Sequence, residues 1–416
     1  MAYVPVELLR VTAWGKTVGA LAAGRRGGSV FQYDQAWLQH GIELAPNLMP
    51  IKAGEKLYSS SPVPEVFRGL PPMLADSLPD SFGNALVDAH LAQLGVRSAD
   101  VSGLDRLAYV GNRGLGALEF EPQMETGLAQ PTSLELAELV SAARAAVAGE
   151  LTEGAPRAIQ QLLSVGTSAG GYQAKAVVAW ERSTGELRAD SPGLPKAFEP
   201  WILKFDVSDA ALGRIEYAYA LMAQAAGISL PEVHLLEESG RAHFMSRRFD
   251  RVDGRKLHMQ SLAAIAGMDF TLLGTHSYAQ LFGQVDALGL GAAARQECFR
   301  RAAFNTLAAN CDDHPKNFSF LLDEQEQWTL APAYDLTFAW NPENPWLARH
   351  HLGIEGKYSD VNLQDLLRMA DYFAVPDARE TLDQVAAAVV DWPRFAATAA
   401  VPDATSALIS VSLSAG

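Results

Sequence analysis

The first 33 residues alternate between apolar and polar positions with a period of two, which is typical of strands buried on one face. The alternation predicts strands at residues 8–13, 18–22 and 29–33, with a tight turn at 14–16. Because the connections are short, the three strands are predicted to form a small antiparallel sheet.

Downstream, the apolar positions follow helical spacing. Asp80 is a candidate N-cap for a helix that Gly95 ends, and Thr132–Glu135 has the form of a capping box. From about residue 150, strand-like stretches at 175–180, 200–207 and 242–249 enclose a helical run at 216–227. After residue 255 the pattern is mostly helical, including 292–309 and 363–373, with one hairpin at 318–322 and 327–331.

These patterns predict an α+β protein in three consecutive units. Residues 1–150 form a mixed, β-rich N-terminal subdomain, and residues 151–254 resemble a nucleotide-binding small lobe with a Gly-rich loop. Residues 255–416 form a mostly helical catalytic lobe.

Composition narrows the range of functions. The chain has 416 residues, 49% of them apolar, so it can bury a large core. A formal charge of −15 opposes broad attraction to phosphate backbones, so contact with DNA is expected only locally or through a partner. Two isolated cysteines support neither a disulfide framework nor a structural zinc, and favour a reducing cytoplasm. No export signal and no unbroken membrane-spanning run is apparent, so no membrane contact is expected.

The most specific motif is ANCDDHPKNFSFLLDE, residues 309–324, where an apolar helix runs into a polar turn and then a strand. Phosphoryl transfer needs a carboxylate to accept the hydroxyl proton and an amide oxygen to hold Mg²⁺. Protein kinases carry both as Asp-x-x-x-x-Asn on one loop, which is the spacing of Asp312 and Asn317. Asp335, just beyond the predicted hairpin, is placed as a second magnesium ligand. On its own, the motif could equally be an ordinary turn, because its residue types are common in turns. The loop, the hairpin and the second Asp together favour a kinase site.

A Gly- and Ser-rich stretch, SVGTSAGGYQAKAVVAW, occupies residues 164–180. Small residues let backbone N–H groups converge on phosphate oxygens, although the spacing is not that of a Walker A motif. The candidate phosphate-binding residues are Ser168, Gly170, Gly171 and Lys175. A Gly-rich hairpin without a ligand is the alternative.

Lys204 is a charged residue in an otherwise apolar strand, where an unpaired ammonium would be costly. Kinases use such a lysine for the α- and β-phosphates and anchor it with a helical Glu, for which Glu216 is available. An edge-strand lysine that points into water is the alternative. Lys175 competes with Lys204 as the phosphate ligand, and the sequence leaves that choice open.

Four further candidates carry less specific signals. His314 is either a nucleotide contact or a hydrogen-bonding turn residue, and Phe249 is either an adenine contact at the hinge between lobes or a core residue. Lys316 is a catalytic candidate within the loop, and Tyr334 a nucleotide contact beside Asp335. The adjacent pair at 350–351, two histidines, is predicted to be exposed loop.

At these motifs the chain resembles the HipA family of type II toxin–antitoxin kinases over nearly its whole length. WGKTVGALAAG, LADSLPDSFGNAL and GNRGLGALEFEP resemble the N-terminal subdomain of that family. SAGGYQAK resembles its phosphate loop, and DDHPKNFS and APAYDLT resemble its catalytic loop and metal-binding Asp.

The resemblance implies a bilobal kinase-like α+β fold that uses ATP and Mg²⁺. It implies Asp312 as the base, Asn317 and Asp335 as magnesium ligands, Lys204 as the phosphate-binding lysine and Ser168 as an autophosphorylated serine. It further implies toxicity by phosphorylation of a protein serine; in the best-known member the substrate is an aminoacyl-tRNA synthetase, glutamyl-tRNA synthetase. Neutralisation by a helix-turn-helix antitoxin of HipB type, which would carry the contact with DNA, is also implied.

The chain departs from the family pattern at the hinge. The family often has an acidic residue before Arg-Phe-Asp, and this chain has Arg247 at that position, before Arg248, Phe249 and Asp250. Adenine contacts made by the backbone of the hinge would survive this difference, whereas a contact made by the acidic side chain would be lost. Two other functions stay open: a small-molecule phosphotransferase, and a non-catalytic co-repressor that acts with a DNA-binding antitoxin.

Overall fold

The N-terminal region folds around an antiparallel sheet. The computed structural model describes residues 3–24, 28–54, 56–59, 64–124, 136–147, 160, 162–163, 173–190, 193–208 and 210–414. The three strands predicted from the alternation are confirmed, and two more complete the sheet in the order β4-β3-β2-β1-β5. Its strands are β1 (Leu8–Ala13), β2 (Lys16–Ala23), β3 (Ser29–Tyr33), β4 (Leu57–Ser59) and β5 (Leu118–Glu121).

Helices accompany this sheet: α1 (Gln35–His40), α2 (Pro72–Ala75), α3 (Ser81–Gln93), α4 (Gly103–Val110) and α5 (Leu136–Val147), with short 3₁₀ turns at Ile51–Ala53, Glu65–Phe67 and Ser98–Asp100. Asp80 is the N-cap of α3, as predicted, and its Oδ1 accepts a hydrogen bond from Gly83 N at 2.7 Å. The expected capping box at Thr132–Glu135 lies outside the described residues.

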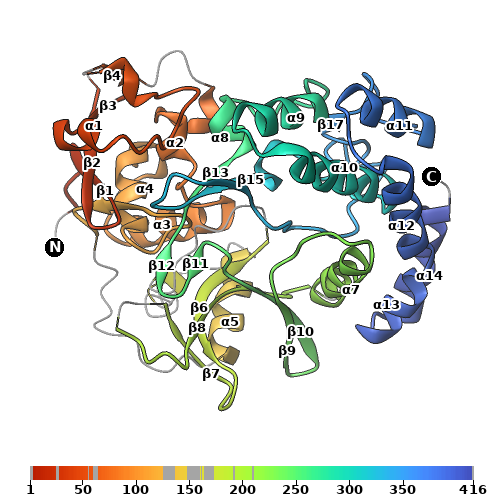
Figure 1. The fold of residues 1–416 in the computed structure, drawn as a ribbon. Helices are drawn as coiled ribbons and strands as arrows, with labels where there is room; N and C mark the ends of the chain where they lie inside the picture. The colour runs from red at the N-terminus through yellow and green to blue at the C-terminus, as the bar shows by residue number, and fades with distance from the viewer. Residues whose placement is uncertain are drawn as a thin grey trace.

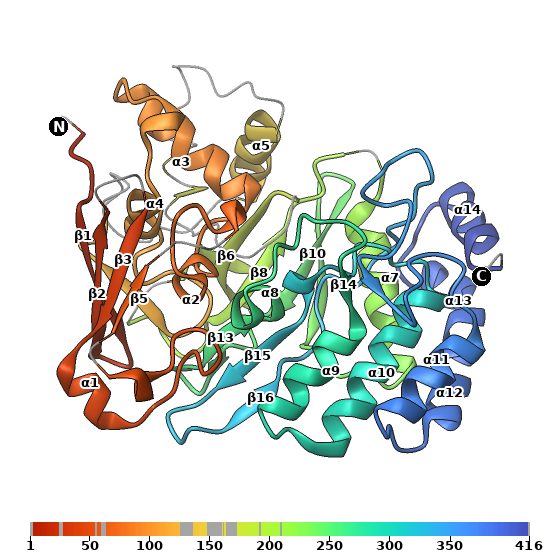
Figure 2. The ribbon, with the colours of Figure 1, turned by 90° about the horizontal axis from the view of Figure 1, so that it is seen from above.

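A second antiparallel sheet has the order β7-β6-β8-β10-β9. It contains β6 (Lys175–Glu181), β7 (Glu186–Ala189), β8 (Glu199–Lys204), β9 (Val233–Glu238) and β10 (Arg241–Arg247), with helix α7 (Leu212–Ala225) inserted between β8 and β9. Figure 2 shows α3 and α5 lying beside this sheet. Side chains of α3 and α5, including Leu86 and Leu139, share one apolar core with Val178, Trp201 and Leu203 of the sheet.

The C-terminal part is mostly helical, as predicted, and occupies the side of the molecule opposite the N-terminal sheet (Figure 1). Its helices are α8 (Leu262–Ala266), α9 (Tyr278–Ala287), α10 (Gly291–Leu307), α11 (Leu363–Tyr372), α12 (Ala378–Val390), α13 (Trp392–Thr398) and α14 (Asp403–Ser414). They share one large apolar core with α7, which includes Tyr219, Phe299 and Trp392.

Short strands connect these layers. The predicted hairpin is β15 (Ser319–Leu322) with β16 (Trp328–Leu330), and β13 (His258–Ser261) extends it to three strands. Two small pairs are β11 (Arg251–Val252) with β12 (Arg255–Lys256), and β14 (His276–Ser277) with β17 (Leu352–Gly353). Among the described residues, no helix has the length and apolar character needed to cross a bilayer.

Candidate active site

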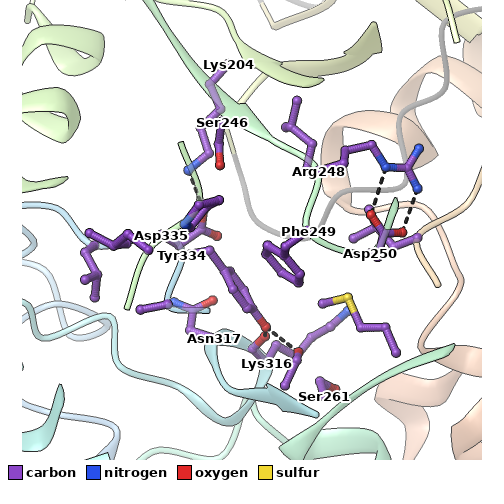
Figure 3. Close-up of a pocket in the computed structure, with 18 of the residues that line it drawn as sticks. Lys204, Ser246, Arg248, Phe249, Asp250, Ser261, Lys316, Asn317, Tyr334 and Asp335 are labelled. Carbon is purple, nitrogen blue, oxygen red and sulfur yellow. Dashed lines mark hydrogen bonds and ion pairs between the residues drawn. The ribbon is translucent and has the colours of Figure 1, made fainter. Parts of the chain in front are cut away.

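A pocket opens between the second sheet, the hinge at residues 248–250 and the β15–β16 hairpin (Figure 3). Strands β8 and β10 and the hinge supply one wall, and the catalytic loop and its hairpin supply the other. Loops of the N-terminal region close a third side. The first wall includes Ile202, Lys204, Phe244, Ser246 and Phe249, and the second includes Lys316, Asn317, Ser319, Tyr334 and Asp335. The third side is lined by Asp76, Ser77 and Leu115.

Lys204 stands at the centre of a buried ion-pair cluster. Its ammonium pairs with Glu216 of α7, the partner expected from the sequence, and also with Oδ1 of Asp335. Burial disfavours the charged lysine, but Asp335 and Glu216 outweigh that cost and raise the pKa of Lys204 above its ordinary value. The two carboxylates therefore hold the lysine in its charged form in the wall of the pocket.

Lys175 is committed elsewhere. Its ammonium lies 3.6 Å from Oδ2 of Asp80, and both side chains are almost fully buried. Burial raises the pKa of Asp80 to about 6, although Lys175 and the Gly83 N–H favour its ionised form. Lys204 lines the pocket, whereas Lys175 lies at the junction with α3, so the geometry favours Lys204 as the phosphate ligand.

Asp335 occupies a special backbone position. The chain leaves β16 through Pro332 and turns at Asp335, whose φ of 54° lies in the left-handed region. Short polar side chains such as Asp tolerate this region better than most. The strong field of Lys204 keeps the carboxylate ionised: burial raises the pKa of Asp335, but Lys204 and Lys175 overcome it and hold the pKa below its ordinary value.

The catalytic loop begins where α10 ends and closes in a 3₁₀ turn at Pro315–Asn317. Asn317 Nδ2 donates to the backbone oxygen of Asp312 at 2.8 Å, which fixes the loop and leaves the amide oxygen of Asn317 for another partner. Burial raises the pKa of Asp312 to about 6, while a hydrogen bond from Trp346 opposes the shift. The raised pKa brings the proton affinity of the Asp312 carboxylate closer to neutral pH, as the role of a general base would require.

Asn317 and Asp335 fit a magnesium ion. Both line the pocket; among contacts between described residues, the amide oxygen of Asn317 has no partner, and Asp335 pairs with Lys204 through Oδ1. Mg²⁺ prefers such oxygen ligands and usually completes its shell with phosphates and water. Accordingly, in the part of the chain that the structure describes, no group of three His, Cys, Asp or Glu side chains is placed to hold a metal by itself.

Two aromatic rings from opposite walls face each other across the pocket. The rings of Phe249 and Tyr334 stack with centroids 5.7 Å apart and planes inclined by 29° (Figure 3). The Tyr334 hydroxyl donates to the backbone oxygen of Lys316 at 2.7 Å, which fixes the ring against the catalytic loop. A flat apolar ring such as adenine would fit against these faces.

His314 and Lys316 belong to the same loop. The His314 ring is near Phe270 and Trp346, and its Nε2 is 3.7 Å from Oδ1 of Asp312. Burial lowers the pKa of His314 to about 4, so the ring is neutral at physiological pH. Lys316 lines the pocket and places its ammonium 5.2 Å from the centre of the Phe270 ring.

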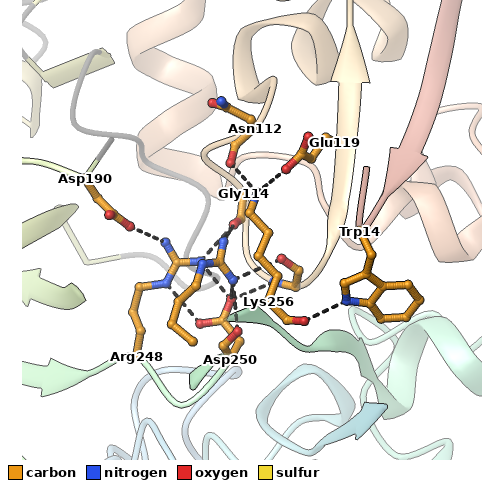
Figure 4. A network of polar contacts seen from close by, with 10 residues as sticks. Trp14, Asn112, Gly114, Glu119, Asp190, Arg248, Asp250 and Lys256 are labelled. Atoms are coloured by element: carbon orange, nitrogen blue, oxygen red, sulfur yellow. Dashed lines mark hydrogen bonds and ion pairs between the residues drawn. The ribbon is translucent and has the colours of Figure 1, made fainter. Parts of the chain in front are cut away.

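The hinge is fastened to the N-terminal region by a buried charge network (Figure 4). The Arg248 guanidinium is 1% exposed and contacts Asp250 at 2.7 Å, Asp190 at 3.1 Å and the Gly114 carbonyl at 2.9 Å. Burial raises the pKa of Asp250, but Arg248 and Arg251 overcome it and hold that pKa well below its usual range. Arg247, the residue that departs from the family pattern, points away from the pocket and pairs with Glu199 at 3.0 Å.

Two expectations need comment. The prediction that His350 and His351 form exposed loop is wrong: they are only 8% and 2% exposed. Asp313 holds both, through His350 Nδ1 at 3.2 Å and His351 N at 2.7 Å. The phosphate-loop candidates Ser168, Gly170 and Gly171 lie outside the described residues. Trp346, which contacts Asp312, was not a candidate, because no motif marks it.

Comparison with protein families settles the relationship. The model described as the HipA-like C-terminal domain matches residues 167–392, and the HipA N-terminal domain matches residues 9–121. The chain belongs to the HipA family. Its fold agrees: HipA of Shewanella oneidensis MR-1, solved in a complex with HipB and operator DNA, superposes with a TM-score of 0.70 at 18% identity, over 97% of this chain and 95% of that one.

Two curated relatives come from Sinorhizobium fredii (strain NBRC 101917 / NGR234). The HipA-family chain is 27% identical over 365 residues to "Putative kinase Y4mE", an alignment that covers 82% of this chain and 80% of that protein. It is 28% identical over 153 residues to "Putative kinase Y4dM", of which it spans 36%. These relatives support a kinase-like transferase within the family.

Proposed function

We propose that this HipA-family chain is an ATP- and Mg²⁺-dependent serine/threonine protein kinase and the toxin of a HipA/HipB-type toxin–antitoxin system. The observation that carries the proposal is the convergence of Lys204, Asn317 and Asp335 on one pocket, with Asp312 bonded to Asn317 through its backbone oxygen in the same loop. These four residue types in this arrangement are the parts that phosphoryl transfer from ATP requires.

Each residue has a role in the proposed reaction. The ammonium of Lys204 neutralises charge on the phosphates, and Asp312 accepts the proton of the attacking serine hydroxyl. The serine oxygen bonds to the γ-phosphorus as the bond from that phosphorus to the β,γ-bridging oxygen breaks, and ADP leaves with the bridging oxygen. Asn317 and Asp335 would hold Mg²⁺, which would supply charge neutralisation for the transferred group. Phe249 and Tyr334, whose rings stack on each other, offer an aromatic surface on which the adenine packs.

The wider system follows from the family. The Shewanella HipA was solved with HipB and operator DNA, and we extend a HipB-type partner to this chain. At a net charge of −15, DNA contact through that partner is favoured over direct binding. The protein substrate is proposed to be an aminoacyl-tRNA synthetase such as glutamyl-tRNA synthetase. A reaction that uses ATP beside a DNA-bound antitoxin belongs in the cytoplasm.

The decisive experiment incubates the purified chain with γ-labelled ATP, Mg²⁺ and a host lysate, followed by identification of what becomes labelled. We expect label on protein serine or threonine, lost in Asp312→Asn and after addition of a magnesium chelator. Label on small molecules alone would favour a small-molecule phosphotransferase. Absence of nucleotide binding would favour a non-catalytic co-repressor.

A further inference from the structure

The segment that follows Asp335 is attached to the catalytic loop at several points. The backbone of Ala339 bonds to both Ala309 and Cys311, at 3.2 and 3.0 Å. Further along, Asp313 holds His350 and His351. Residues 339–351, called here the flanking segment, are therefore fixed beside Asp312 at both ends.

Within the flanking segment, Trp346 reaches the base itself. Its indole Nε1 donates to Oδ1 of Asp312 at 2.7 Å. The ring lies 4.2 Å from the ring of His351, centroid to centroid, and the His351 Nε2 is 2.9 Å from the Trp346 carbonyl oxygen. The loop that carries Trp346 closes on itself through Asn341 N and the Leu347 carbonyl, 3.2 Å apart. The indole is thus held in place before any acceptor arrives.

Burial in an apolar core does not account for this position. Trp346 belongs to none of the three apolar cores found in the described residues, and the five residues before it, 341–345, are exposed. A tryptophan on an exposed loop gains little from pointing its N–H at a carboxylate unless the carboxylate needs a fixed orientation. The contact with Asp312 is therefore the main polar role that the structure gives the indole.

We propose that Trp346 is a positioning residue for the base: its N–H holds Oδ1 of Asp312 so that Oδ2 faces the acceptor hydroxyl. This inference rests on the proposed kinase function. Among contacts between described residues, Oδ2 of Asp312 has no partner, and the side chain is 37% exposed. The indole can only donate a hydrogen bond, so it orients Asp312 and cannot take the proton in its place. In enzymes that activate a nucleophile with a base, the base is commonly oriented by a third group.

The test compares two tryptophans of the same segment. Trp346→Phe removes the N–H and keeps a ring against His351, while Trp340→Phe alters an exposed tryptophan that has no hydrogen bond or ring contact with described residues. Loss of one hydrogen bond to a charged group should lower the maximal rate of protein labelling about 10- to 100-fold. The KM for ATP should stay at the wild-type value, because the pocket is not touched, and the melting temperature should fall by no more than a few degrees, because only one hydrogen bond is lost. Trp340→Phe should match the wild type throughout.

A second measurement does not depend on activity. The chain has eight tryptophans, and in a ¹⁵N-indole spectrum the resonance lost in Trp346→Phe identifies Trp346. In Asp312→Ala this resonance should move upfield, because the N–H loses its carboxylate acceptor.

The outcomes separate the two proposals. A wild-type maximal rate in Trp346→Phe, or an equal loss in Trp340→Phe, overturns the positioning role. If the Trp346 indole resonance does not move in Asp312→Ala, the contact between Trp346 and Asp312 is refuted, even where the wild-type protein is an active kinase. If the wild type labels no protein while the resonance does move, the kinase function fails and the catalytic role fails with it, although the contact stands.

Discussion

Substitution of Asp250 by Asn should loosen the hinge and destabilise the protein. The carboxylate accepts four hydrogen bonds: from Arg248 Nε at 3.0 Å, Arg248 Nη2 at 2.7 Å, Arg251 Nη1 at 2.5 Å and Gly116 N at 2.8 Å. It is 1% exposed. Removal of one charge from a buried pair costs about 3–5 kcal/mol, because the remaining charge is left without compensation. Arg248 keeps Asp190 and the Gly114 carbonyl, so we expect the lower end, about 3 kcal/mol.

The same change should weaken ATP binding. Phe249 lies between Arg248 and Asp250 and lines the pocket, so a loosened hinge releases one aromatic face. The loss of about one ring contact, roughly 1 kcal/mol, corresponds to a Kd several times higher. Urea unfolding and calorimetric titration with ATP measure the two effects.

The pH dependence gives an internal check. The pKa of Asp250 is depressed in the folded protein, so its contribution to stability is present above the unfolded value of about 4 and fades as the pH falls toward the folded value. The stability difference between wild type and Asp250→Asn should therefore shrink below about pH 4. Asp253→Asn, an exposed turn residue three positions away, is the matched control. Equal urea midpoints for wild type and Asp250→Asn at pH 7 would refute the reasoning.

The other predictions concern the reaction. Asp312→Asn should lower protein labelling by about 10²–10⁴-fold with an unchanged fold, since it removes the general base and keeps its shape; labelling at the wild-type rate would move the base elsewhere. Asp335→Ala should remove the Mg²⁺ dependence of ATP affinity in calorimetry, whereas an unchanged affinity would exclude it as a ligand. Mass spectrometry should find phosphate on Ser168 in active protein and none in Asp312→Asn, and Ser168→Asp should lose ATP binding through charge repulsion. The isolated chain should show no tight, salt-sensitive DNA binding in a shift assay unless its antitoxin is present.

Local patterns predicted the elements that are regular over several residues. The alternation at residues 8–33, the cap at Asp80 and the hairpin after the catalytic loop are all found in the structure. Several strands were missed, among them β9 and β13. β9 is half-buried along most of its length and lacks clean alternation. β13 has four residues, and its partners in β15 lie between 58 and 64 positions away in the sequence.

At the candidate site, the contacts of a side chain could be predicted where its residue type is unusual for the strand or helix that carries it. A lysine in an apolar strand predicted its helical carboxylate partner, and Lys204 and Glu216 do pair. Contacts that depend on tertiary packing were not predictable. Asp80 and Lys175 are 95 positions apart and meet only because α3 packs on the second sheet. The contact of Trp346 with Asp312 likewise joins two loops whose compositions suggest only turns.

The apolar core that joins α3 and α5 to the second sheet bears on how the gene can be divided. Leu86 and Leu91 of α3 are fully buried together with Trp201 and Leu203 of β8. A chain cut between residues 124 and 136 would leave α3 in one fragment and its packing surface in the other. Each fragment would expose an apolar face that is complementary to the face of the other fragment. Burial of several large side chains, at about 1.5–3 kcal/mol each, would favour association of the two fragments. A cut at this position thus divides the protein into two fragments whose association can be measured when both are made in the same cell.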